Sequence, residues 1–213
     1  VLAAKGEISG TLVMGVIPTA SAYAARIAIH LYGLYPKIVA RIETASSLEI
    51  QQRIEDGTID AGLTYGDDVS GDMVSVRHVY DERYALLAPV AMVEKGKTSI
   101  TWAEAAELPL SLLEPKMQNR RILDRMFEEV GARPRIVSES NVMMTSMIMA
   151  REGLAAAVVP VVVLEAMGPF KGTVSLPLTD PDLGKSICLL TAARMPGLPT
   201  VEALRRALDT FPS

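Results

Sequence analysis

Short apolar runs alternate with helix-like segments in the first part of the chain, and this alternation most constrains the fold. Residues 12–17, 37–43 and 59–64 are short runs dominated by apolar side chains, which is typical of buried strands. Residues 20–34 carry apolar side chains at helical spacing, and residues 46–56 form a second helical stretch. The order strand, helix, strand, helix, strand predicts a parallel sheet with right-handed crossover connections.

Capping and breaking residues mark the ends of these segments. Pro18 ends the first strand, and Tyr35, which precedes a proline, is pushed away from helical backbone angles. Ser46 followed three residues later by Glu49 is a capping box, so a helix should begin here. Gly57 should end it, because glycine readily adopts the left-handed conformation that follows many helices.

The second half of the chain repeats this rhythm without a convincing residue-level repeat. A second capping box, Thr101 to Glu104, predicts a short helix, and Asn119 could cap a later one. Further strands are expected at residues 83–88, 110–113, 135–138, 154–159, 174–178 and 186–192, and further helices at 119–130, 141–152 and 200–210. Because no Gly/Ser-rich or Pro-rich linker separates the halves, we expect two closely packed α/β lobes.

Composition excludes several classes of protein. With 213 residues, 49% of them apolar and 22% charged, the chain is neither disordered nor low in complexity. The most apolar run, residues 154–164, is interrupted by Pro160 and is too short to cross a bilayer, so no membrane association is expected. The formal net charge of -4 is not expected to favour direct nucleic-acid binding, since such binding relies on neutralised phosphates.

Motifs for catalysis are absent from the sequence. No phosphate-binding loop, nucleophile elbow or metal-binding histidine motif is present. His30 and His78 have no neighbours that would complete a triad or a metal site, and Cys188 is a single cysteine in an apolar strand. The chain is therefore not expected to be an enzyme or to need a cofactor or metal.

Three small polar clusters lie where a predicted strand passes into a helix. They are Thr19 with Ser21, Ser46 with Ser47, and Gln118 with Asn119. Ligands of open parallel sheets bind at the carboxyl ends of the strands, where helix N-termini also favour anions. These side chains are candidates to bind a small polar or anionic ligand, and simple helix capping is the alternative reading, especially for Ser46.

The order and spacing of several segments resemble one known family across essentially the whole chain. The sequence resembles the effector-binding domain of LysR-type bacterial transcriptional regulators. The segments that carry the resemblance are residues 10–15, 18–19, 35–36, 47–48, 56–62, 86–89, 108–109, 127–131 and 151–160.

This resemblance implies the type 2 periplasmic-binding-protein fold, in which two α/β, Rossmann-like lobes are joined by crossover strands. Regulatory lobe I would comprise residues 1–81 plus 187–213, and lobe II residues 82–186. A small-molecule effector would bind between the lobes. The residues that the resemblance points to are Thr19, Ser46, Ser47 and Tyr65 in lobe I and Gln118 and Asn119 in lobe II. Arg120 or Arg121 could balance a carboxylate.

The resemblance also implies partners. Domains of this kind pair as homodimers, here with residues 20–34 of one copy against residues 120–130 of the other, and full-length regulators are often homotetramers. DNA would be bound only by an N-terminal winged helix-turn-helix, which this chain lacks, and the protein would be cytoplasmic. The alternative is a solute-binding receptor of a transporter, which has the same fold.

Overall fold

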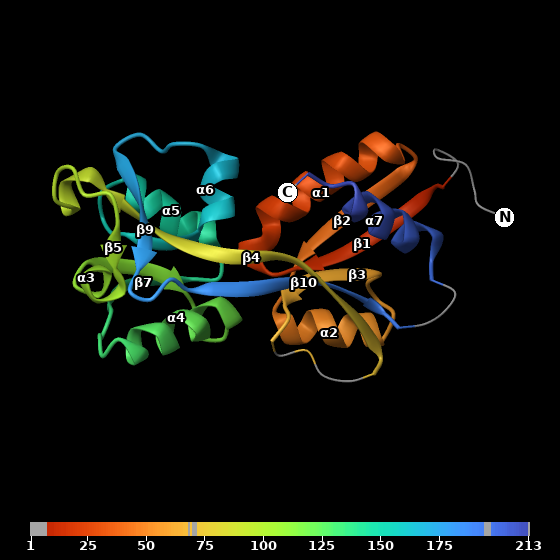
Figure 1. The fold of residues 1–213 in the computed structure, drawn as a ribbon, viewed down its shortest axis with the longest axis horizontal. Helices are drawn as coiled ribbons and strands as arrows, with labels where there is room; N and C mark the ends of the chain where they lie inside the picture. The colour runs from red at the N-terminus through yellow and green to blue at the C-terminus, as the bar shows by residue number, and fades with distance from the viewer. Residues whose placement is uncertain (1–7, 68, 70–71, 194–196, 213) are drawn as a thin grey trace. The chain divides into compact units, whose positions relative to one another are not determined.

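The computed structural model describes residues 8–67, 69, 72–193 and 197–212, and the chain forms two compact units. Unit 1 comprises Val1–Tyr80 and Ser186–Ser213, and unit 2 comprises Asp81–Lys185. The chain passes from unit 1 into unit 2 within β4 (Val74–Pro89) and returns within β10 (Gly184–Ala192) (Figure 1).

Unit 1 is built on a sheet in which the strands follow the order β2-β1-β3-β10. β1 (Gly10–Val16) pairs in parallel with β2 (Ile38–Thr44) on one side and with β3 (Ala61–Tyr65) on the other. β10 joins β3 in the antiparallel direction. The parallel strand–helix–strand arrangement expected from the alternating pattern is therefore confirmed for the first three strands.

Helices cover both faces of this sheet. Their bounds are α1 (Ser21–Leu34), which follows the 3₁₀ turn Pro18–Ala20, α2 (Ser47–Glu55) and α7 (Pro199–Asp209). Figure 1 shows α1 and α7 on one face and α2 on the opposite face. α1 buries Ala24, Ile27 and Leu31, which lie three and four residues apart and so share one side of the helix.

Two glycines allow α2 to approach the sheet closely. Gly15 of β1 and Gly62 of β3 are partners in the strand register. A Cβ atom added to Gly62 would overlap Ile50 of α2, and one added to Gly15 would lie 2.7 Å from Cδ1 of Ile59 and 3.1 Å from Cγ1 of Ile50. The absence of a side chain at both positions therefore sets how deeply Ile50 packs against the sheet.

Unit 2 contains two groups of paired strands. β4 pairs in antiparallel fashion with β8 (Ala157–Pro160) and β9 (Thr173–Thr179), and β9 pairs in parallel with β5 (Ile100–Thr101). β6 (Pro109–Leu113) and β7 (Arg135–Ser140) form a separate parallel pair. The helices are α3 (Trp102–Ala106), α4 (Gln118–Glu129), α5 (Met143–Arg151) and α6 (Val161–Met167), and a 3₁₀ turn spans Val90–Met92.

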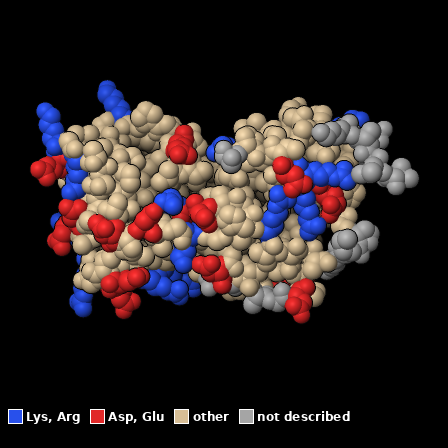
Figure 2. Space-filling model, viewed as in Figure 1, with Lys and Arg blue, Asp and Glu red and all other residues tan. Residues whose placement is uncertain are grey.

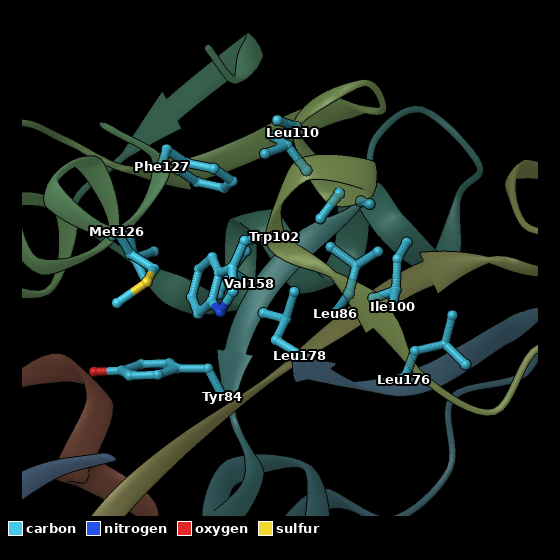
Figure 3. Close-up of a cluster of buried hydrophobic side chains, with 14 of the residues drawn as sticks. Tyr84, Leu86, Ile100, Trp102, Leu110, Met126, Phe127, Val158, Leu176 and Leu178 are labelled. Carbon is cyan, nitrogen blue, oxygen red and sulfur yellow. The ribbon is translucent and has the colours of Figure 1, made fainter. Parts of the chain in front are cut away.

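Trp102 lies at the centre of the hydrophobic core of unit 2 (Figure 3). Its ring is fully buried and makes edge contacts with Phe127, at 5.4 Å between ring centroids, and with Tyr84, at 6.4 Å. The indole N–H donates a hydrogen bond to the backbone oxygen of Pro181, at 3.0 Å, so the one polar atom of this side chain is paired. This core packs α3 and α4 against strands β4 and β9.

The observed elements differ from the expected ones in a few places. β4 begins at Val74 rather than near residue 83. The apolar pattern did not predict the first half of this strand, because that half is largely exposed and carries charged side chains. β8 begins at Ala157, since Leu154 is 59% exposed and lies outside the strand. The capping boxes at Ser46 and Thr101 are confirmed, each with both reciprocal hydrogen bonds.

Within the described ranges, no helix combines the length and the apolar character that crossing a membrane would require.

Candidate functional site

Two of the predicted site residues of unit 1 are in direct contact. Thr19 follows β1 in the 3₁₀ turn Pro18–Ala20, and Tyr65 is the last residue of β3. Their hydroxyl oxygens lie 3.3 Å apart, and either can donate the hydrogen. Both side chains are buried, with 0% and 2% of their surface exposed. Because β1 and β3 are adjacent and parallel, the hydroxyl groups meet at the carboxyl edge of the sheet.

Ser46 is committed to capping α2. Its Oγ accepts a hydrogen bond from the backbone N–H of Glu49, at 3.3 Å, and donates to Oε2 of Glu49, at 2.7 Å. The backbone N–H of Ser46 donates to the same carboxylate oxygen, at 2.8 Å. Helix capping therefore explains the hydrogen bonds of the Ser46 side chain. A cap of this kind stabilises the start of a helix by about 1 kcal/mol.

Ser47, the first residue of α2, has a different environment. The residue is half-buried, but its Oγ is shielded from solvent and has no hydrogen-bond partner among the residues that the structure describes. The N–H of Ala45, two residues earlier, donates to the backbone oxygen of Val16, at 3.1 Å. That bond places the start of α2 at the carboxyl end of β1, the edge where Thr19 and Tyr65 meet.

Thr64 is a buried polar residue at the same edge that sequence reasoning missed. It lies next to Tyr65 on β3, is 1% exposed, and its hydroxyl has no hydrogen-bond partner within the described part of the chain. The signal in the sequence was a single polar side chain, just before Tyr65, in an otherwise apolar strand. That signal is weak because threonine is common in strands.

Gln118 and Asn119 belong to unit 2 and begin α4. The prediction that Asn119 caps this helix is wrong: the N-cap is Met117, whose backbone oxygen accepts from the N–H of Arg121, at 3.2 Å. Asn119 is 4% exposed and lies inside the first helical turn, while Gln118 is half-buried. Both side chains remain at a helix N-terminus, where partial positive charge favours anions.

Arg120 is fully engaged within unit 2. Its Nε donates to Asp124, at 2.8 Å, and one terminal nitrogen donates to Glu139, at 2.6 Å, and to the backbone oxygen of Leu113, at 2.9 Å. Burial lowers the pKa of the Arg120 guanidinium, but the hydrogen bonds to Glu139 and Asp124 outweigh burial and raise that pKa overall. The charge of Arg120 is thus balanced inside the unit, whereas Arg121 is exposed.

The remaining candidates from the sequence have structural contacts. Nε2 of His30 lies 3.0 Å from the Thr210 hydroxyl, and its ring packs edge-on against Phe211. Cys188 is 5% exposed, with its Sγ 3.6 Å from Oγ of Ser186. Among the described residues, no group of three or more His, Cys, Asp or Glu side chains is placed to hold a metal ion.

Basic and acidic side chains are interspersed on the face of the molecule shown in Figure 2, with uncharged surface between them. Several charged side chains form ion pairs within one unit, among them Arg83 with Asp182 in unit 2 and Arg53 with Glu43 in unit 1. That face therefore has no broad basic patch of the kind that binds the phosphate backbone of a nucleic acid.

Nearly the whole chain is similar to one known protein family. Residues 5–212 match the model of the family described as LysR substrate binding domain. The HTH-type transcriptional regulator SsuR of Burkholderia cenocepacia is 28% identical over 131 residues, which cover 61% of this chain and 42% of that protein. The matched stretch thus spans less than half the length of the regulator.

Solved structures show the same fold. The regulatory domain of Synechocystis PCC6803 CcmR, in complex with 2-PG, superposes with a TM-score of 0.81 at 15% identity, covering 95% of this chain and 98% of that one. The BenM effector binding domain with its effector benzoate gives a TM-score of 0.75 at 17% identity, covering 93% and 90%. The expected two-lobe, periplasmic-binding-protein-like α/β fold is confirmed by these matches.

Proposed function

Because the chain belongs to the LysR substrate binding domain family, we propose that it senses a small organic acid or another small anion for a transcriptional regulator. Members of this family are regulators rather than enzymes. The observation that carries the proposal is the family match over residues 5–212. The relative SsuR, named as a transcriptional regulator, favours this function over that of a transporter's solute receptor.

The polar edge of unit 1 supports an anionic ligand. The hydroxyl groups of Thr19 and Tyr65 meet where β1 and β3 end, and Ser47 begins α2 at the same edge. Hydroxyl groups and the amides of a helix N-terminus donate hydrogen bonds to carboxylates and similar groups. In this proposal Thr19, Ser47 and Tyr65 contact the effector, and Ser46 acts by holding the start of α2 in place.

Unit 2 contributes Gln118 and Asn119 in this proposal. Their amide groups can both donate and accept hydrogen bonds, so they can bind neutral as well as charged groups of an effector. Of the solved relatives, the BenM domain is described with benzoate, a carboxylate, and the CcmR domain with 2-PG. A small organic acid is the ligand class that these descriptions suggest for this chain.

Sensing requires that the effector bind one arrangement of the protein more tightly than another. An effector with equal affinity for both arrangements would shift nothing, however tightly it bound. We propose that effector binding changes the DNA binding and transcriptional activity of a full-length, cytoplasmic regulator. The DNA would be contacted by a helix-turn-helix domain and not by this chain.

The apolar outer face of unit 1 supports the proposed homodimer. On α1, Ile29 is 73% exposed and Tyr32 is 65% exposed. Large apolar side chains exposed on one helix are typical of surfaces that another protein covers. The partner copy is proposed to place α4 against α1, and full-length chains to assemble as tetramers.

A thermal-shift screen tests the proposed ligand class. Purified protein is heated with small organic acids, aromatic acids and inorganic anions, and a ligand that binds only the folded state raises the unfolding midpoint. Asn119→Ala and Ser47→Ala should each reduce the shift given by a hit, with each shift measured from the ligand-free midpoint of the same variant. A hit whose shift is the same in both variants would contradict the proposed site.

A further inference from the structure

We propose that the hydroxyl group of Thr64 is a further anion-binding group of unit 1, acting with Ser47 and the N-terminus of α2. The inference rests on the proposed function, because it assigns an additional residue to the binding of the same small anion. It arises from two buried hydroxyl groups, those of Ser47 and Thr64, that have no partner in the described part of the chain.

The Thr64 hydroxyl is costly to the fold as it stands. The residue is 99% buried, since only 1% of its surface is exposed, and its Oγ1 makes no hydrogen bond with any described residue. A buried hydroxyl without a partner is unfavourable, and almost all buried polar groups in proteins are paired with protein, water or a ligand. Valine has the same shape as threonine and would fill this position without that cost.

The side chain of Thr64 faces α2. Alternate residues of a strand point to the same face of a sheet, so Thr64 shares its face with Gly62. A Cβ atom on Gly62 would meet Ile50 and Ile54, which are both residues of α2. The threonine therefore lies under α2, one side-chain position closer to the carboxyl end of β3 than the glycine.

Thr64 also lies at the height of the first turn of α2. Ile50 packs over Gly62, and Ser47 is three residues nearer the helix start, or about 4.5 Å along the helix axis. Thr64 is two residues beyond Gly62, or about 6.6 Å along the strand in the same direction. The helix begins at the carboxyl end of the sheet, as the bond from Ala45 to Val16 shows, so the two hydroxyl groups lie at one end of α2.

The chemistry of this end of the helix suits an oxyanion. The capping box occupies the N–H of Glu49, and the N–H groups of Ser47 and Leu48 have no acceptor within the helix. Two hydroxyl donors, these N–H groups and the helix dipole all favour a group with several acceptor oxygens and negative charge. The ligand class is a carboxylate or a tetrahedral oxyanion such as sulfate or phosphate.

Thr64→Val is the first variant of the test, and Thr191→Val is its matched control. Thr191 lies on β10, is 2% exposed and accepts a hydrogen bond from Arg205, at 2.6 Å. Without any anion, the melting midpoint of Thr64→Val should rise by about 2–4 °C, because an unpaired hydroxyl has been removed. The midpoint of Thr191→Val should fall, because one terminal nitrogen of Arg205 loses the hydroxyl that accepts its hydrogen bond.

The second arm measures binding by titration calorimetry with inorganic sulfate, inorganic phosphate and benzoate as probes. Thr64→Val should bind the probe that the wild type binds about 10-fold more weakly, since a hydrogen bond to an ionised group is lost. Thr64→Ser should keep most of the affinity, and Thr191→Val should keep all of it.

Three results would overturn the role of Thr64. If the ligand-free midpoint of Thr64→Val falls, the hydroxyl already has a partner, such as a buried water. If Ser47→Ala loses the probe while Thr64→Val binds it as the wild type does, the anion site stands and Thr64 is no part of it. If the wild type binds none of the three probes, the proposed function in its oxyanion form fails together with this inference.

Discussion

The hydroxyl groups of Thr19 and Tyr65, 46 positions apart in the sequence, lie 3.3 Å from each other in a fully buried contact. This bond ties the turn that follows β1 to the end of β3, so the edge of the sheet is ordered before any ligand arrives. A preformed edge reduces the entropy that a ligand must lose on binding.

Removing one partner of this contact should weaken the fold. Tyr65→Phe leaves the buried Thr19 hydroxyl without this partner, and the free energy of unfolding should fall by about 1–2 kcal/mol. Denaturant titration monitored by circular dichroism measures the change. Thr19→Ser keeps the hydroxyl and serves as the control. A Tyr65→Phe protein as stable as the wild type would show that the bond contributes nothing.

The exposed apolar face of α1 gives a prediction about assembly. Ile29→Asp places a charge where Ile29 is 73% exposed, so it should leave the folded chain intact but shift a dimer toward monomer. Light scattering during size-exclusion chromatography measures the mass. Met167→Asp, on an exposed apolar position of α6 in unit 2, should not change it. Equal masses for the wild type and Ile29→Asp would count against a dimer through α1.

Trp102 should dominate the stability of unit 2. Trp102→Ala removes a fully buried indole from between Tyr84 and Phe127 and should cost about 3–5 kcal/mol of unfolding free energy. The exposed Leu154 offers a comparison, since Leu154→Ala should change stability by less than about 0.5 kcal/mol. Similar effects of the two substitutions, measured by denaturant titration, would contradict the packing described for this core.

The carboxylate in the capping box of α3 should make the stability of the fold depend on pH. The hydrogen bond from Lys97, with further bonds from Thr101, lowers the pKa of Glu104 below the usual range of a glutamate carboxyl group. A carboxyl group with a lowered folded pKa stabilises the fold above its unfolded pKa, and this contribution disappears as the pH falls through the folded value. The stability difference between the wild type and Glu104→Gln should therefore be largest near neutral pH and vanish in acid. A difference that grows in acid would refute the assignment.

The alternation of apolar runs and capping residues was enough to predict the parallel strands and most helices. Its failures have physical causes. The first half of β4 is exposed and charged, so it shows no apolar periodicity, and its strand character comes from pairing within the sheet. Asn119 looked like a cap because its side chain suits that role, but the helix begins earlier, at Gln118.

The candidate site was only partly readable in the sequence. Thr19 and Tyr65 were singled out separately, and only the folded structure shows that their hydroxyl groups are in contact. Thr64 escaped notice because the lack of a partner for its hydroxyl is a property of the packed molecule and leaves no mark in the sequence. The roles of Gln118 and Asn119 toward an effector stay predictions.

The routing of the chain through β4 and β10 has a consequence for synthesis. Unit 2 is continuous, Asp81–Lys185, whereas unit 1 is assembled from a segment before it and a segment after it. Strand β10, which completes the unit 1 sheet beside β3, leaves the ribosome only after all of unit 2 has been made. Unit 2 can therefore fold while the chain is still growing. Until β10 has been made, the edge of β3 stays unpaired, so chaperones can bind it and it can pair with a wrong strand.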